Sequence, residues 1–155
     1  MKKQKKSSDY KDEFMVVSGN GFGFRFPLSK LSETTRSGRK IMNLKNDDRM
    51  IGFAPVIHSH VFLATSKGKA VVIPTDQITQ LTGSGKGVIL LKPGESSLVG
   101  FKFVTLKDKV TLVFDSGNAK EITVKSVRLC NRLRVESCLF QEARLAVGIP
   151  VSFFR

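Results

Sequence analysis

Short apolar runs separated by glycines and polar turns follow one another along most of the chain. The clearest runs lie at 61–65, 70–73, 88–91 and 98–104. A Lys67-Gly68 turn separates the first two runs, Pro74 follows the second, and a Gly-rich polar loop precedes the third. Runs of this length bounded by Gly and Pro are typical of strands joined by tight turns. The pattern therefore predicts about four strands in this stretch and leaves helix a minor component.

The chain also matches itself at a shift of about 47 residues, so this pattern recurs. Residues 18–45 align with 65–92, and one added residue then aligns 50–52 with 98–100. Identical positions include Gly21 with Gly68, Pro27 with Pro74, Ser37-Gly38 with Ser84-Gly85, and Leu44-Lys45 with Leu91-Lys92. A third copy begins at Val110, with Gly117 in the place of the turn glycine, and the match fades after Val127, as expected for an atypical terminal repeat.

Four short strands in each repeat are typical of propeller-like folds, in which blades are arranged radially. Val, Ile and Phe are abundant and Ala is scarce, which also favours strands over helices. We therefore expect an all-β domain over 14–155, after a flexible basic tail at 1–13. It should hold about three four-stranded blades. Their expected bounds are about 14–60, 61–109 and 110–155.

Charge narrows the range of partners. The 26 Lys and Arg residues outnumber the 13 Asp and Glu residues, which gives a formal net charge of +13 and favours a polyanionic partner. No apolar run approaches the roughly 18 residues of a membrane span, and no apolar run follows the lysine-rich N-terminus. We expect a cytoplasmic protein without membrane contact, in which Cys130 and Cys138 are free thiols.

A basic glycine loop is the strongest functional signal. It occurs as TTRSGRK at 34–40 and again as LTGSGKG at 81–87. Glycine lets a backbone come close to a phosphate, and Arg or Lys at the same place adds charge-assisted hydrogen bonds. Alternatively, the glycines serve only turn geometry, and Arg39 and Lys86 are ordinary solvated charges. Recurrence at one place in two copies of so basic a chain favours a polyanion-binding surface.

Enzyme and metal motifs are not evident. The second loop lacks the P-loop framework, because Gln80 and Gly87 stand where Gly and Ser or Thr are required. His58 and His60 have no acidic or Cys ligand near them in sequence, so we expect them in a surface loop. We therefore expect no cofactor, no metal and no small-molecule substrate.

The two best copies resemble the C-terminal repeats of bacterial type IIA topoisomerase A subunits, meaning gyrase and topoisomerase IV. The resemblance covers about residues 14–127. It rests on the hairpins GFGFRFP and GKAVVIP, on the segments RSGRKIMNLKNDD and GSGKGVILLKPGE, and on the IG or VG strand that follows. It implies a β-pinwheel, a disc of four-stranded blades that exchange strands, whose basic rim binds duplex DNA and bends it.

The gyrase hallmark loop QRRGGKG is incomplete in both copies. The matching residues are Arg36, Gly38 and Arg39 in the first copy and Gly85, Lys86 and Gly87 in the second. The Gln and the first Arg are replaced by Thr34 and Thr35, and by Leu81 and Thr82. This departure makes topoisomerase IV the closer likeness.

The resemblance also implies that the chain is no enzyme by itself. The family's cleavage chemistry needs a tyrosine in a helix-turn-helix module, whereas the sole tyrosine is Tyr10 in the tail. The chain would be part of an ATP-dependent topoisomerase, working at the nucleoid with the ATPase partner and the remaining parts of the topoisomerase.

We expect contacts to DNA phosphates without reading of base sequence. The expected DNA-binding residues of the two loops are Arg36, Arg39, Lys40, Lys45, Lys86 and Lys92. Those expected in the third unit are Lys125, Arg128, Arg132 and Arg134. Two alternatives stay open: a protein-interaction module of a chromosome-associated complex, which exposed Phe22 and Phe24 would favour, and a basic RNA-binding β-protein.

Overall fold

The computed structural model describes residues 12–32, 35–45, 47–113 and 117–127. Within these ranges the chain forms nine strands and three short 3-10 helices, so the prediction of an all-β fold is confirmed. Several predicted features lie outside the described residues. These are the tail as far as residue 11 with Tyr10, the two cysteines, and Arg128, Arg132 and Arg134.

The sequence repeat is a structural repeat. The strands are β1 (Glu13–Ser18), β2 (Phe22–Pro27), β3 (Met50–Pro55), β4 (His60–Thr65), β5 (Ala70–Pro74), β6 (Val88–Ile89), β7 (Leu98–Val104), β8 (Lys109–Val113) and β9 (Ala119–Thr123). The 3-10 helices are η2 (Leu28–Leu31), η3 (Thr75–Gln77) and η4 (Val124–Ser126). Each 3-10 helix directly follows the second strand of a hairpin, so the order strand, turn, strand, short helix occurs three times.

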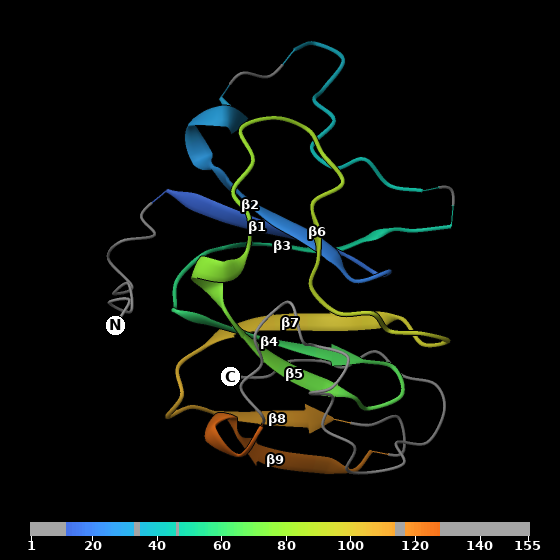
Figure 1. Cartoon of the computed structure of the whole chain (residues 1–155), viewed down its shortest axis with the longest axis vertical. Helices are drawn as coiled ribbons and strands as arrows, with labels where there is room; N and C mark the ends of the chain where they lie inside the picture. The colour runs from blue at the N-terminus through green and yellow to red at the C-terminus, as the bar shows by residue number, and fades with distance from the viewer. Residues whose placement is uncertain (1–11, 33–34, 46, 114–116, 128–155) are drawn as a thin grey trace.

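Three antiparallel sheets are stacked along the long axis of the molecule (Figure 1). The first sheet has the order β3-β1-β2-β6 and the second β5-β4-β7, and among the described residues the third consists of β8 and β9. β6 belongs to the second sequence copy but pairs with β2 of the first, through Phe22 opposite Ile89 and Gly23 opposite Val88. The fourth strand of the first sheet is therefore exchanged from the next repeat, as a β-pinwheel requires.

Glycine closes each hairpin. Gly21, Gly68 and Gly117 all have positive φ, at 82°, 75° and 78°. A Cβ at Gly21 would lie 1.8 Å from the carbonyl oxygen of Leu91 in the second copy, so this turn also needs the space that glycine leaves. The prolines act as predicted, because β2 ends at Pro27 and β5 ends at Pro74.

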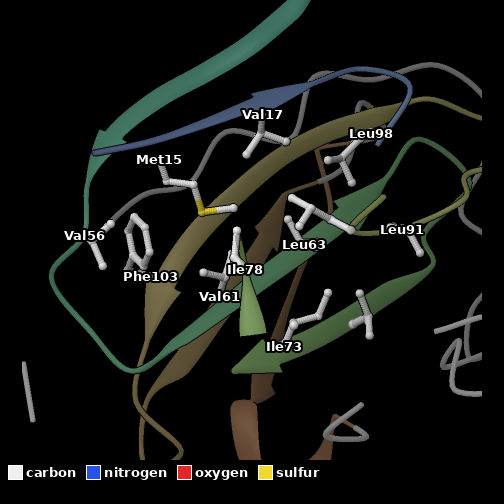
Figure 2. Close-up of a cluster of buried hydrophobic side chains, with 12 residues drawn as sticks. Met15, Val17, Val56, Val61, Leu63, Ile73, Ile78, Leu91, Leu98 and Phe103 are labelled. Carbon is white, nitrogen blue, oxygen red and sulfur yellow. The ribbon is translucent and has the colours of Figure 1, made fainter. Parts of the chain in front are cut away.

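Two apolar cores lie between neighbouring sheets. The first joins Met15 and Val17 of β1 to Val61 and Leu63 of β4, with Leu98 and Phe103 of β7 around them (Figure 2). The second joins Phe62 and Ala64 of β4 to residues of the third sheet, among them Val110 and Leu112. Because adjacent side chains of a strand point to opposite faces, β4 supplies apolar side chains to both cores. All six residues of β4 are accordingly buried.

A third apolar cluster lies on the first sheet's other face, which points away from the second sheet. Val16, Phe24 and Phe26 are buried there under Met42. Leu31, Ile41 and Leu81 pack against the same cluster. This face is therefore covered by the polar segments that follow β2 and η3, which contain the two basic glycine loops.

Candidate nucleic-acid interface

The two basic glycine loops lie side by side although about 47 residues separate them in sequence. After η3 the chain crosses to the first sheet, where the Arg25 amide donates to the Thr79 carbonyl at 2.9 Å and the Leu81 amide donates to the Arg25 carbonyl at 2.7 Å. Further on, the Asn43 amide donates to the Gly85 carbonyl at 2.8 Å, within a parallel bridge between Met42 and Gly85. Both loops thus belong to one surface at the end of the molecule far from β8 and β9 (Figure 1).

Arg25 of β2 holds the segment after η3 against the first sheet. Its side chain is buried, donates from Nε to the Ile78 carbonyl at 2.9 Å, and pairs with the carboxylate of Glu13. A buried cation is tolerated only when paired and hydrogen-bonded, as here. Arg25 therefore has a structural role, and the sequence pattern offered no means to separate it from the rim arginines.

The loop glycines do not share one role. Gly87 has a φ of 79°, and a Cβ there would lie 2.5 Å from the carbonyl oxygen of Gly23, so Gly87 lets the chain meet β2. Gly38 has a φ of 82° but open space around it, and its amide donates to the Thr35 carbonyl at 2.9 Å in an exposed turn. For Gly87 the structure thus favours the alternative interpretation, in which a loop glycine serves the geometry of the backbone. Gly38 leaves the backbone of the first loop accessible.

The predicted basic residues of the two copies lie in the paired loops or in the segments that follow them. Those with exposed side chains are Arg36, Lys40, Lys45, Lys86 and Lys92. Arg39 is half-buried and donates from a terminal guanidinium nitrogen to the Lys30 carbonyl at 2.6 Å, which holds the first loop against η2. The loops thus present a concentrated positive surface, and Arg39 also contributes to its architecture.

Lys86 is positioned by an aromatic ring. Its Nζ lies 4.2 Å from the ring centroid of Phe22, a cation–π distance that holds the ammonium group over the end of β2. Phe22 is half-buried beneath this contact, and Phe24 is fully buried in the cluster behind it. Neither side chain is the exposed aromatic anchor that would favour the protein-interaction alternative. The sequence did not identify Phe22 as a partner of the loop lysine.

The structure does not bring every predicted residue to this surface. Lys125 is exposed in η4 beside β8 and β9, at the opposite end of the molecule from the two loops (Figure 1). Any contact it makes with a long polyanion would be a separate one. Within the described residues, the predicted site is therefore divided between the segments of the two loops and one distant lysine.

A hollow between the loops is too small for a nucleobase. It is about 20 Å³ in volume, enough for roughly one water molecule. Lys30, Arg39, Thr82 and Ser84 are among the residues that line it. The surface is therefore suited to contacts with a backbone that passes over it, and not to enclosing a small molecule.

The histidine prediction needs a correction. His60 is 3% exposed and begins β4, so it does not lie in a surface loop. Its Nδ1 is 2.9 Å from the Ser59 hydroxyl, and burial lowers its pKa against the opposing effect of Asp76. Among the residues that the structure describes, no group of three or more His, Cys, Asp or Glu side chains gathers as a metal site would require. No helix in this described part is long and apolar enough to cross a membrane.

Family comparison identifies the fold. Residues 12–57 and 59–114 match the model of the DNA gyrase C-terminal domain, a beta-propeller. The chain belongs to this family. The matched residues include both copies of the basic loop, and the match confirms the resemblance to type IIA topoisomerase A subunits.

Curated relatives of this gyrase C-terminal family come from both enzyme types. The chain is 27% identical over 126 residues to the A subunit of DNA gyrase from Ureaplasma parvum, which covers 78% of the chain and 15% of the relative. It is 26% identical over 83 residues to the A subunit of DNA topoisomerase 4 from Streptococcus pyogenes, which covers 52% and 10%. The chain thus spans about a sixth or less of the length of these relatives.

Solved C-terminal domains share the fold. The C-terminal domain of DNA topoisomerase IV superposes with a TM-score of 0.70 at 24% identity, covering 80% of this chain and 41% of that one. The DNA gyrase A C-terminal domain gives 0.69 at 20% identity, covering 93% and 47%. The β-pinwheel architecture of this gyrase C-terminal family member is therefore confirmed, and the chain corresponds to less than half of either domain.

Proposed function

We propose that the chain binds duplex DNA through the paired basic loops and bends it along the rim, without reading base sequence. The hydrogen bond from the Asn43 amide to the Gly85 carbonyl carries the proposal, because it joins two copies of one basic motif into one surface. A single loop would offer a few scattered charges. Two joined loops bring exposed basic side chains of both copies to one surface, over which a phosphate backbone can pass.

The setting of this activity is a type IIA topoisomerase. The chain would serve as the C-terminal DNA-binding part of its cleavage subunit, topoisomerase IV-like because neither loop carries the full gyrase hallmark. DNA cleavage and ATP hydrolysis would then belong to other parts of the enzyme, including its ATPase partner, in the cytoplasm at the nucleoid. The family match and the relatives from both enzyme types support this placement.

Fluorescence anisotropy with duplexes of about 20 and 60 base pairs tests the proposal. If six to ten phosphates are contacted, the affinity should fall by about 10³ to 10⁵-fold between 50 and 200 mM salt. The longer duplex should bind more tightly, because bending brings more of the backbone onto the rim. A flat salt response, or equal binding of both duplexes, would contradict the proposal.

Matched triple variants separate the loop surface from overall charge. Arg36, Lys40 and Lys86 are changed together to Ala, and Arg39 is left in place because it supports the loop. The control changes Lys67, Lys107 and Lys120 to Ala, which removes the same charge from exposed positions outside the loops. We expect the loop variant to lose most of its affinity and the control to lose little. Equal losses would show that net charge alone binds DNA.

The alternatives give different results in the same assays. A protein-interaction module would capture a specific partner that persists after nuclease treatment, and its DNA affinity would not depend on the loop residues. An RNA-binding β-protein would prefer single-stranded RNA in competition with duplex DNA.

A further inference from the structure

Ile89 is an exposed apolar residue on the face of the first sheet that carries the basic loops. It is 41% exposed and lies in β6, at an edge of this sheet. Its neighbours Val88 and Leu90 pack in the core between the first and second sheets. Because adjacent side chains of a strand point to opposite faces, Ile89 points to the other face, where both loops lie.

A lysine and this apolar side chain meet at the same aromatic ring. Ile89 is directly opposite Phe22 of β2. Opposite residues of an antiparallel pair point to one face, with Cβ atoms about 4.5 to 5.5 Å apart. The Nζ of Lys86 lies 4.2 Å from the centroid of the Phe22 ring. A positive charge and an exposed apolar group therefore occupy the same small part of the surface.

The first copy lacks this arrangement. The residue that aligns with Ile89 is Met42, which is 6% exposed and belongs to the apolar cluster on this face. Met42 is bridged to Gly85 of the second loop. The exposure of Ile89 is therefore not a property of the repeat, and it occurs beside the lysine of the second loop.

A nucleic-acid backbone has the chemistry that matches this pair. Each phosphate, which an ammonium group can bind, is joined to a deoxyribose whose carbon atoms are apolar. A polyanion such as polyphosphate offers the same charge without the sugar. Burying apolar surface of the protein stabilises a complex only where the ligand also removes that surface from water, so a lysine beside an isoleucine can distinguish the two ligands.

The charges around Ile89 favour this ligand over an apolar protein surface. Lys86 and Lys92 lie three residues before and after Ile89, and both side chains are exposed. An apolar protein surface that covered Ile89 would take such ammonium groups out of water without pairing them, which is costly. Phosphates pair them, and the net charge of +13 attracts a polyanion to this surface.

We infer that Ile89 packs on the deoxyribose next to the phosphate that Lys86 binds, so that the surface selects a nucleic-acid backbone over other polyanions. The inference rests on the proposed DNA binding and adds a specificity-determining residue to it. Covering the exposed part of one isoleucine strengthens binding about three- to eightfold. The contact carries no charge, so this contribution should be the same at every salt concentration.

Ile89→Ser tests the inference in the full chain. Fluorescence anisotropy is measured with a labelled DNA duplex and with labelled linear polyphosphate, each over a salt series. We expect the duplex affinity to fall about three- to eightfold with an unchanged salt slope, and the polyphosphate affinity to stay as in the parent chain. Ile89→Lys should lose the same apolar contact but bind polyphosphate more tightly, because it adds a cation.

Ile57→Ser is the matched control. Ile57 is also an isoleucine, is 51% exposed, and lies between β3 and β4, outside both loops. It should leave both affinities unchanged. Circular dichroism checks the fold of each variant, and if Ile89→Ser unfolds, Ile89→Thr keeps the β-branched shape that suits a strand and takes its place.

The outcomes separate this inference from the proposed function. A parent chain with a steep salt response, together with an Ile89→Ser variant that binds the duplex as the parent does, would overturn the inference alone. Equal losses of duplex and polyphosphate affinity would also overturn it, because the residue would then not distinguish the ligands. A flat salt response of the parent chain would contradict DNA binding itself, and this inference with it.

Discussion

The two copies of the repeat make an internal comparison, because similar sequence is placed in two different surroundings. Both copies form a hairpin closed by a left-handed glycine, and both continue into a short 3-10 helix and a basic loop. They differ in what lies against them. Leu98 and Phe101 of the second copy pack into the core between the first and second sheets, whereas the aligned Met50 and Phe53 of the first copy are exposed.

This difference shows which properties belong to the repeat and which belong to its position. Hairpin geometry depends on residues within the copy, so it recurs. Burial depends on the neighbouring sheet, so Leu98 is 1% exposed while its counterpart Met50 is 47% exposed. The basic loop differs in the same way. Arg39 bonds to a carbonyl of its own copy, whereas its counterpart Lys86 lies over Phe22 of the other copy.

The largest expected effect is in the core between the sheets. Leu98→Ala should lower the free energy of unfolding by about 2 to 5 kcal/mol, because it leaves a cavity among fully buried neighbours. Met50→Ala at the aligned position should change it by no more than about 0.5 kcal/mol. Urea denaturation measures the free energy of unfolding of both variants. Similar losses would mean that the two positions are equally covered in solution.

The next effect concerns the exchanged strand. Gly87→Lys gives the second loop the residue that the first loop has at the aligned position, Lys40. The positive φ of Gly87 and the nearby Gly23 carbonyl leave no room for a Cβ there. We expect a loss of about 2 kcal/mol or more, since the left-handed conformation alone costs roughly 1 to 2. The reciprocal Lys40→Gly should cost at most about 1 kcal/mol. Thermal unfolding measures both, and a harmless Gly87→Lys would contradict the close packing of β6 on β2.

A smaller effect separates the two aligned basic residues. Arg39→Ala should lower the free energy of unfolding by about 1 kcal/mol, because the Lys30 carbonyl loses its charged donor. Lys86→Ala should leave stability within about 0.5 kcal/mol and reduce the salt slope of DNA binding by about 0.9. Denaturation and anisotropy are measured on both variants. A larger loss of stability in Lys86→Ala than in Arg39→Ala would contradict this prediction.

The smallest effect is a dependence on pH. His60 occupies the position of Glu13 in the first copy, and burial lowers its pKa below the usual value of about 6.5. As pH falls below that value, the unfolded chain takes up a proton that the folded chain excludes, so stability decreases until the folded-state pKa is reached. His60→Gln should flatten the stability profile between about pH 7 and 5. His58→Gln is the control for the loss of a histidine. An unchanged slope in the His60→Gln variant would contradict the prediction.

Much of the fold and part of the site could be predicted from sequence. The strands of the second copy, the ends of β2 and β5 at proline, and the grouping of basic residues in two loops all depend on local signals. The buried position of His60 could not be predicted, because a single histidine beside a strand carries no periodic signal. The structural use of Arg39 and the role of Phe22 required knowledge of distant neighbours.

The sequence by itself determined the repeat, its hairpins and the charge of the rim, because turn glycines, prolines and alternating apolar residues act over a few positions. Only the tertiary structure decided that β6 joins the sheet of the other copy and that the two loops meet through the Asn43 amide and the Gly85 carbonyl. It also decided in which of the two sequence copies an apolar residue is buried, as for Leu98 and its exposed counterpart Met50. These outcomes depend on contacts between residues tens of positions apart, which local patterns cannot specify.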